Sequence, residues 1–257
     1  MALTLTPVLT AANGLQYRIY QLRHEHTPGR FGRGKRYDIA HLSSRGKAEW
    51  LPKLLRHSEV CNRIRHPRIP IYLNYFPASN VREVWWVVDE WVPGRSLSEI
   101  IISEDPIANI PRLALQIAEG LLALHQSGMV LRDLSPETVW IAESGVILTD
   151  FELAKLGEGK PTVSRSWPFS PYRAPELGEL PATPNVDLYS WSQIVTRSLL
   201  GEIPLHRELR TALVAKKLPT DLAQLLERCS SALPSKRPTS ISDILPVVQN
   251  WVKGSSS

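Results

Sequence analysis

The sequence is poor in cysteine, the residue whose disulfides and metal sites stabilise many small or secreted folds. Its 257 residues include only two cysteines, Cys61 and Cys229, and no CxxC or HExxH pattern. Two cysteines cannot build a disulfide framework, and those two patterns are the usual signs of a zinc site. Both cysteines lie in apolar helical patterns, which predicts reduced thiols in the core. We therefore expect no disulfide-dependent fold and no metal site.

Long apolar runs are also missing. The longest one, residues 107–125, is interrupted by Arg112, Gln116 and Glu119, so it does not resemble a membrane span. The N-terminus lacks the basic start and apolar run of a secretory signal. Hydrophobic residues make up 43% and charged residues 21%, the balance of an ordinary globular domain. We expect a cytoplasmic protein with no membrane partner.

The order of the sequence patterns predicts an α+β fold with two lobes. In the first third, strand-like segments at 4–9, 15–22, 36–42, 71–76 and 84–88 surround one helical pattern at 47–64. After a break at Val92-Pro93-Gly94, helical patterns dominate at 113–124, 186–200, 218–230 and 241–252, with short strands at 139–141 and 146–148. We expect an N-lobe over 1–92, a C-lobe over 93–251 and a flexible tail over 252–257.

Several short motifs stand in a fixed order along the chain. They are His66-Pro67, Glu90-Trp-Val-Pro-Gly94, Leu131-Arg-Asp-Leu-Ser-Pro-Glu-Thr138, Asp150-Phe-Glu152, Ala174-Pro-Glu176, Asp187 and Arg237. In this order they resemble the eukaryotic-type Ser/Thr protein kinase family over roughly residues 1–251. The resemblance implies a bilobal protein-kinase-like fold, with helix αC in a β-rich N-lobe, a hinge at 90–94 and a mainly helical C-lobe.

Some of these residues carry structural roles in the family. The resemblance implies a buried bidentate ion pair between Glu176 and Arg237. It also implies that Asp187 accepts backbone N–H groups of the catalytic loop. Leu131 replaces the usual histidine of that loop, which favours an apolar stack with Cys61 and Phe151. These residues preserve a fold and do not by themselves indicate catalysis.

The catalytic positions depart from the family pattern. Phosphoryl transfer needs a flexible glycine loop, a lysine on the phosphates, a glutamate that holds the lysine, and metal ligands. Only Asp133, the acceptor-orienting aspartate, and Asp150, the principal metal aspartate, are retained. The degenerate positions are Gly14 as the single loop glycine, Ala40 (or His41 after a one-residue slip) for the lysine, His57 for the αC glutamate, Thr138 for the metal-binding asparagine and Glu152 for the glycine after Phe151. Lys35 or Arg36 from a neighbouring strand is an alternative source of the lysine charge.

The predicted nucleotide pocket departs from the pattern as well. Its expected lining and hinge residues are Leu9, Asp38, Asp89, Glu90, Trp91, Val92 and Trp140. Trp140 stands where the family places a medium aliphatic residue under the adenine, Asp38 where it places a small alanine, and Asp89 at the gatekeeper position. Together with Asp150 and Glu152, the two pocket aspartates predict a partly filled, acidic pocket that repels nucleotide phosphates.

Positive charge is concentrated in the N-lobe. Residues 17–68 hold 13 Lys or Arg and 4 Asp or Glu, a net charge of +9, whereas the whole chain carries +5. This bias favours an acidic protein partner, although a solvated arginine-rich face would give the same pattern. Aromatic residues are not interleaved with these charges as a stacking platform requires, which disfavours nucleic acid.

Three functional hypotheses follow. The first is a pseudokinase: a protein-binding or allosteric module with absent or very weak phosphotransfer and no expected cofactor. The second is an atypical Ser/Thr protein kinase that uses ATP with magnesium, Asp133 and Asp150. The third is a cleft that accepts a cation or another non-nucleotide ligand.

Overall fold

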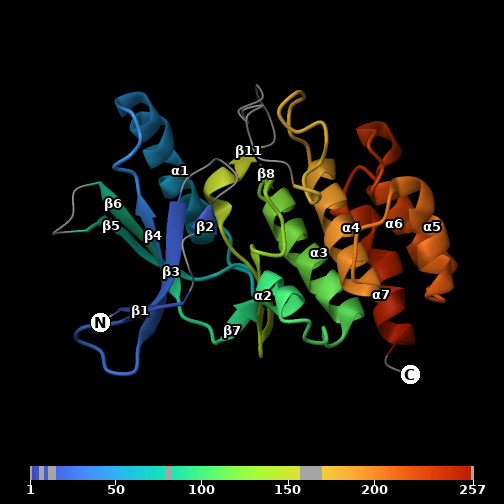
Figure 1. Cartoon of the computed structure of the whole chain (residues 1–257), viewed down its shortest axis with the longest axis horizontal. Helices are drawn as coiled ribbons and strands as arrows, with labels where there is room; N and C mark the ends of the chain where they lie inside the picture. The colour runs from blue at the N-terminus through green and yellow to red at the C-terminus, as the bar shows by residue number, and fades with distance from the viewer. Residues whose placement is uncertain (1, 6–8, 11–15, 79–82, 157–169, 256–257) are drawn as a thin grey trace.

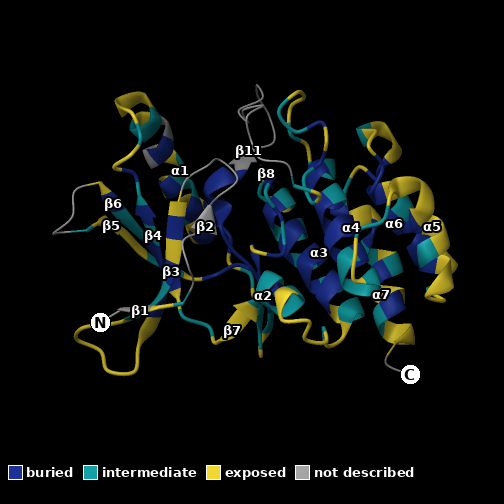
Figure 2. Cartoon of the chain, in the orientation of Figure 1, coloured by how far each residue is buried: buried dark blue, intermediate teal, exposed yellow. Residues whose placement is uncertain are grey.

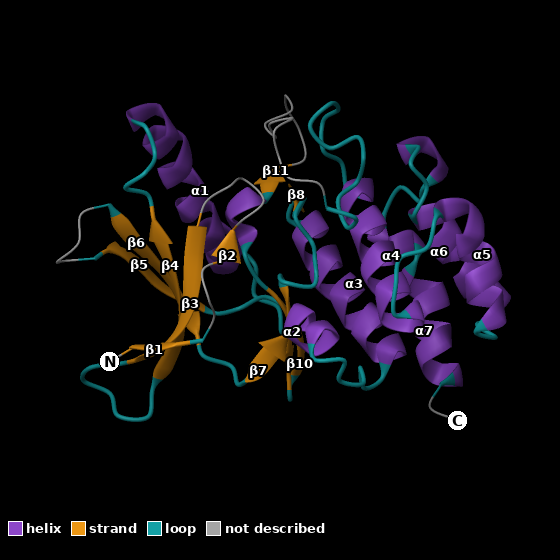
Figure 3. Ribbon diagram, viewed as in Figure 1, coloured by secondary structure: helices purple, strands orange, loops and turns teal. Residues whose placement is uncertain are grey.

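The chain folds into two lobes that lie side by side along its long axis (Figure 1). The structure, a computed structural model, describes residues 2–5, 9–10, 16–78, 83–156 and 170–255. Gly14 lies outside these residues, and so do the side chain of Leu9 and the last two residues of the predicted tail. The N-lobe is mostly strand and the C-lobe mostly helix (Figure 3), so the α+β bilobal prediction is confirmed.

An antiparallel sheet of six strands and one long helix form the N-lobe. The sheet runs in the order β1-β3-β4-β6-β5, and β2 pairs with β3 beside that path. The elements are β1 (Ala2–Thr4), β2 (Leu9–Thr10), β3 (Gln16–Arg23), β4 (Phe31–Asp38), α1 (Ser44–Arg63), β5 (Tyr72–Pro77) and β6 (Val84–Glu90). The α1 helix, which occupies the αC position, begins where the Ser43 hydroxyl accepts a hydrogen bond from the Gly46 N–H.

Two small sheets and six α-helices follow among the described residues of the C-lobe region. The strands are β7 (Gly94–Ser96), β8 (Met129–Val130), β9 (Val139–Ala142), β10 (Gly145–Leu148) and β11 (Lys155–Leu156). The α-helices are α2 (Leu97–Ile102), α3 (Ile110–Gln126), α4 (Asn185–Leu200), α5 (His206–Ala215), α6 (Thr220–Cys229) and α7 (Leu245–Gly254). Short 3-10 turns stand at Phe151–Leu153, Pro234–Lys236 and Ile241–Asp243.

The strand predicted at 36–42 is wrong in position. The observed β4 spans Phe31–Asp38 and begins just after a turn in which the Arg30 N–H donates to the Thr27 carbonyl. The segment holds two glycines and three basic residues and no β-branched residue, so its local propensity resembles that of a loop. Full backbone pairing with β3 on one side and β6 on the other makes it a strand.

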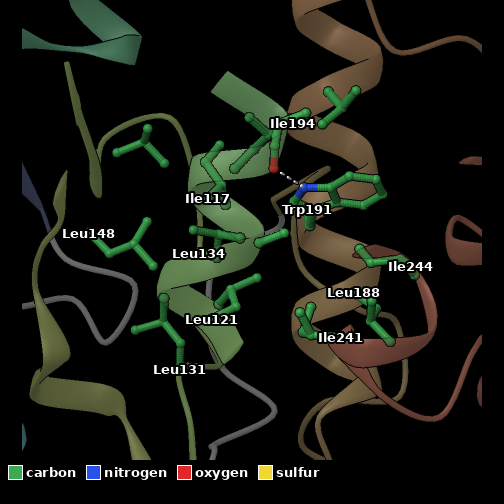
Figure 4. Packing of buried hydrophobic residues seen from close by; sticks show 14 of the residues in the cluster. Ile117, Leu121, Leu131, Leu134, Leu148, Leu188, Trp191, Ile194, Ile241 and Ile244 are labelled. Atoms are coloured by element: carbon green, nitrogen blue, oxygen red, sulfur yellow. Dashed lines mark hydrogen bonds between the residues drawn. The ribbon is translucent and has the colours of Figure 1, made fainter. Parts of the chain in front are cut away.

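The C-lobe core holds the helices together (Figure 4). Ile117 and Leu121 on α3 face Leu188 and Trp191 on α4, and these four side chains are fully buried. The Trp191 indole N–H donates a hydrogen bond of 2.9 Å to the Ala114 carbonyl, so its polar atom is satisfied inside the core. Burial of each such side chain stabilises the fold by roughly 1.5–3 kcal/mol.

Burial is greatest where the two lobes meet and along the C-lobe helices (Figure 2). Within the described part of the chain, no helix is both long and apolar enough to cross a membrane.

A filled cleft between the lobes as candidate functional site

Asp187 holds the backbone of the catalytic-loop segment by hydrogen bonds. It lies in the first turn of α4, is fully buried, and accepts the backbone N–H groups of Leu131 at 2.8 Å and Arg132 at 2.7 Å. His125 Nε2 lies 2.8 Å from the same carboxylate. The predicted contact to the loop backbone is therefore present, and it fixes the loop while Arg132 adopts a left-handed φ of 71°.

The predicted ion pair between Glu176 and Arg237 is also present. The two guanidinium nitrogens donate to the two carboxylate oxygens at 2.6 and 2.8 Å. Arg237 is 3% exposed and also donates to the carbonyls of Ser231 and Asn185. Because both charges are buried and bidentately paired, this contact fixes the segment that follows residue 170 to the end of the C-lobe.

Asp133 and Thr138 lie on the loop that Asp187 supports. Arg173 lies 3.5 Å from the Asp133 carboxylate, yet burial outweighs that attraction and raises the pKa of Asp133 to about 6. The Thr138 hydroxyl accepts from the Ser135 N–H and donates to the Ser135 carbonyl, both at 3.0 Å. Thr138 therefore closes the loop on itself instead of offering a second ligand beside Asp150.

Lys35, in the middle of β4, occupies the position of the expected catalytic lysine. Its Nζ lies 3.1 Å from Asp150 Oδ1 and 4.1 Å from the centre of the Tyr17 ring. Burial lowers the pKa of Lys35, but Asp150, Glu152 and Tyr17 together outweigh it, so the pKa is raised and the lysine stays charged. The assignment of this position to Ala40 or His41 is wrong, because the error in the β4 position shifted it into the exposed turn after the strand.

Glu152 provides the carboxylate that the αC glutamate provides in the family pattern. Lys35 Nζ donates to Glu152 Oε1 at 3.3 Å, and the Tyr37 hydroxyl donates to the same oxygen. Glu152 is buried in the short 3-10 turn after Asp150. The lysine is thus held by two acids of one triplet, and neither comes from α1.

Arg33 enters the cleft two residues before Lys35. Its guanidinium lies 3.4 Å from Asp150, 3.8 Å from Asp89 and 5.6 Å from the centre of the Trp140 ring. Strand alternation places Arg33 and Lys35 on the same face of β4. Arg33, and not Asp38, therefore stands where the family places a small alanine; Asp38 lies at the strand end and caps the Ala40 N–H at 3.1 Å.

Trp140 and the hinge close the other side of the cleft. The indole N–H of Trp140 donates 3.1 Å to the carbonyl of Val92, and the Trp91 ring meets Trp140 edge-on at 6.3 Å. A Cβ at Gly94 would lie 2.8 Å from Trp140 Nε1, so glycine allows this close approach. Trp140 thus fills the predicted place under the adenine and uses a hinge carbonyl, while the Glu90 side chain points to solvent.

His57, on α1, contacts Asp89 instead of the lysine. Its Nε2 lies 2.7 Å from Asp89 Oδ1, and its Nδ1 accepts the backbone N–H of Phe151 at 3.3 Å. Because Nδ1 accepts, Nε2 carries the proton that is donated to Asp89. The ring also stacks on Phe151 at 5.6 Å, and no contact joins it to His41, which is exposed.

These contacts correct the prediction of an acidic pocket. Asp89, Asp150 and Glu152 are present in the cleft, but Arg33 and Lys35 lie among them and pair with them. Burial opposes the charge of Asp150, but Lys35 and Arg33 outweigh it and lower the pKa of Asp150 to about 2. The acids of the cleft are therefore paired with two cations, and the cleft is not the uncompensated acidic site that the sequence predicted.

One group of side chains resembles a metal site. Potential ligand atoms of His57, Cys61 and Asp89 lie within 4.8 Å of one another, and all three residues are buried. The hydrogen bonds described above already use both ring nitrogens of His57. Cys61, Leu131 and Phe151 are fully buried members of one apolar cluster, as the predicted stack requires. The geometry therefore explains this group without a metal.

Comparison with known proteins gives a consistent family. The profile described as "protein kinase domain" matches residues 33–250. A probable serine/threonine-protein kinase of Dictyostelium discoideum is 29% identical over 74% of this chain and 22% of its own length. Serine/threonine-protein kinase TIO of Arabidopsis thaliana is 28% identical over 87% of this chain and 17% of its own length.

A solved structure shows the same fold. The kinase domain of Mycobacterium tuberculosis PknI, crystallised as a double mutant, superposes with a TM-score of 0.70 at 18% identity, over 97% of this chain and 94% of that one. The first curated relatives are much longer proteins, of which this chain spans between 17% and 33%.

Proposed function

The chain belongs to the protein kinase domain family, and we propose that within this family it is a pseudokinase. Its function is to bind a protein partner or to transmit an allosteric signal, with absent or very weak phosphotransfer. The observation that carries this proposal is the filled cleft. Arg33 and Trp140 replace small or medium residues at the nucleotide position, and their polar groups are engaged with Asp150, Asp89 and the Val92 carbonyl.

The residues of the cleft do not fit a magnesium nucleotide. Asp150 is already paired with Lys35 and Arg33, and Thr138 uses its hydroxyl within its own loop. An adenine would have to displace two large side chains, one of which is charged and buried. Removal of one member from a buried ion pair costs about 3–5 kcal/mol, which nucleotide binding would have to exceed. We therefore propose no resident cofactor and no step through ATP.

The same residues suit a rigid binding module. The ion network ties β4 of the N-lobe to the Asp150 triplet, and His57 ties α1 to Asp89 and to Phe151. Polar contacts between side chains therefore join the two lobes, as a bound nucleotide does in an active kinase. A domain held in one arrangement without a ligand presents constant outer surfaces to a partner.

An atypical Ser/Thr protein kinase remains the second candidate, and one observation favours it. Lys35 stands 3.1 Å from Asp150, and Asp133 is present on its supported loop. These three residues would serve as the lysine, the principal metal aspartate and the acceptor-orienting aspartate. The loss of the metal-binding asparagine and of the αC glutamate opposes it.

A phosphotransfer assay separates the two candidates. The purified chain is incubated with labelled ATP, magnesium or manganese, and a general protein substrate, beside Asp133→Asn as the matched control. We expect label incorporation equal to that of Asp133→Asn. Incorporation by the unmodified chain that Asp133→Asn abolishes would overturn the pseudokinase proposal.

A further inference from the structure

The sheet of the N-lobe has an apolar face on the side away from α1. On the α1 side, the Trp50 ring packs 4.9 Å from Tyr37 and covers the sheet. The opposite side, which we call the outer sheet face, consists of Arg18, Tyr20 and Leu22 on β3, Gly32, Gly34 and Arg36 on β4, Trp86 and Val88 on β6, and Leu73 and Phe76 on or beside β5. Phe76 is 37% exposed, and residues 24–30 in the turn after β3 are exposed (Figure 2).

A hollow of about 420 Å³ lies on this face at the end near the β3–β4 turn. Its lining includes the apolar side chains of Leu22, Leu73, Phe76 and Val88, and its charged side chains are Arg23, Arg30 and one acid, Glu25. Gly32 lies in the floor, where a Cβ would be only 2.7 Å from Val88 Cγ1. Glycine at this point lets Val88 pack closely over β4 and form part of the apolar wall, which an apolar side chain of a partner could contact.

The arginines of this face outnumber its acids: Glu25 lines the hollow together with Arg23 and Arg30. Arg18 and Arg36 are direct cross-strand neighbours, an arrangement in which like charges repel. For Arg18, Arg23, Arg30 and Arg36, no carboxylate partner occurs among the described residues, whereas Arg33 and Lys35 on the inner face of β4 form ion pairs with Asp89, Asp150 and Glu152. The basic residues of the N-lobe thus form two groups: those on the inner face of the sheet pair with acids, and those on the outer sheet face do not.

We propose that the outer sheet face binds an acidic protein segment that inserts one apolar side chain into the hollow around Gly32. This inference rests on the proposed function, for which it supplies the partner and the surface. A second copy of this chain is disfavoured, because a two-fold contact would place arginines against arginines. A nucleic acid would gain charge attraction but no contact with the apolar floor, whereas an acidic peptide with an apolar anchor satisfies both features.

Selection from a phage-displayed library of random peptides tests this proposal. The library is selected on the unmodified chain after depletion on the double variant Arg23→Glu/Arg30→Glu. The control variant Arg207→Glu/Arg210→Glu reverses two exposed arginines of α5 in the other lobe. We expect acidic peptides with one conserved apolar position. Their affinity should fall at least tenfold in Arg23→Glu/Arg30→Glu, stay unchanged in the control variant, and weaken as salt is raised.

Three results would overturn the proposal: no enriched peptide of acidic character, equal affinity for both double variants, or a tighter complex with a single-stranded oligonucleotide probe. A concentration-dependent dimer that Arg23→Glu/Arg30→Glu dissolves would instead assign the face to self-association and overturn it too. None of these readouts depends on phosphotransfer, so the proposed pseudokinase function and this binding surface fail or survive separately.

Discussion

Two neighbouring regions differ in how many residues of the kinase family pattern they retain. One is the set of contacts that supports the catalytic loop, and the other is the interlobe cleft. In the C-lobe, Asp187 still holds the loop backbone, and Glu176 still pairs with Arg237. In the cleft, Arg33, Trp140 and Glu152 replace small or medium residues: the Arg33 guanidinium pairs with Asp150 and lies 5.6 Å from the centre of the Trp140 ring, and Glu152 pairs with Lys35. Contacts that hold a backbone are needed with or without a ligand, whereas under our proposal the residues of the nucleotide position serve as part of the core.

The largest expected effect comes from the C-lobe support. Replacement of Arg237 by alanine leaves the Glu176 carboxylate buried and unpaired, so the free energy of unfolding should fall by about 3–5 kcal/mol. Arg207→Ala is the matched control because Arg207 pairs with Glu208 on the surface, with 79% of its side chain exposed, and it should change stability by less than about 0.5 kcal/mol. Urea unfolding at pH 7 measures both. Equal losses in the two variants would show that the buried pair does not support the fold.

The next largest loss of stability is expected for Lys35, and a substitution in the turn after β4 serves as its control. Lys35→Met keeps the apolar stem but leaves Asp150 and Glu152 without their shared cation, and it should cost about 3 kcal/mol. His41→Ala, at an exposed position, should cost less than about 0.5 kcal/mol. Thermal unfolding compares them. If His41→Ala is the costlier change, the lysine position belongs to the turn and the ion network is not a stabilising element.

The smallest effect is expected at Asp133, where the substitution should raise the stability of the fold instead of lowering it. Its folded pKa of about 6 lies above the ordinary value of 3.8, so the folded state binds an extra proton between these two values. The unmodified chain should therefore lose stability as pH rises from about 4 to 6, and Asp133→Asn should not. Because 23% of the side chain is exposed and Arg173 stands beside it, we expect a gain of only about 1 kcal/mol for Asp133→Asn at pH 8.

Unfolding of both chains from pH 4 to pH 8 checks that prediction. The difference should vanish near pH 4, where Asp133 is protonated in the folded state. A constant difference across this range would mean that the substitution acts through packing and not through the charge.

The sequence predicted the C-lobe better than the N-lobe, for physical reasons. The α3 and α4 helices have long apolar stripes, so their periodicity is strong and their observed bounds lie close to the predicted ones. The α5 helix was missed, because only Leu209 and Leu213 are buried in it and charged residues surround them. The Ala174-Pro-Glu176 triplet and Asp187 were placed correctly because their partners stand at fixed distances from clear motifs.

The cleft was harder to predict, since strand pairing, and not local propensity, forms β4. The predicted strand at 36–42 leaves out residues 31–35, because the two glycines and three basic residues of β4 weaken its local strand signal. Its displacement moved the lysine position to Ala40 and hid the role of Arg33. Arg33 and Lys35 stand two residues apart, so in a strand their side chains lie on the same face of the sheet. This spacing is the sequence signal that would have placed both side chains in the cleft.

The most direct test of the account compares nucleotide binding by two chains. Thermal unfolding is followed with ATP or ADP, with and without magnesium or manganese, for the unmodified chain and for Arg33→Ala/Trp140→Leu, which restores the residue types of the family pattern. A ligand at 100 times its dissociation constant stabilises a protein by about 2.7 kcal/mol, or about 5–10 °C in Tm for a domain of this size. The account predicts no shift for the unmodified chain and a saturable shift for the double variant. A saturable, metal-dependent shift of the unmodified chain would contradict it.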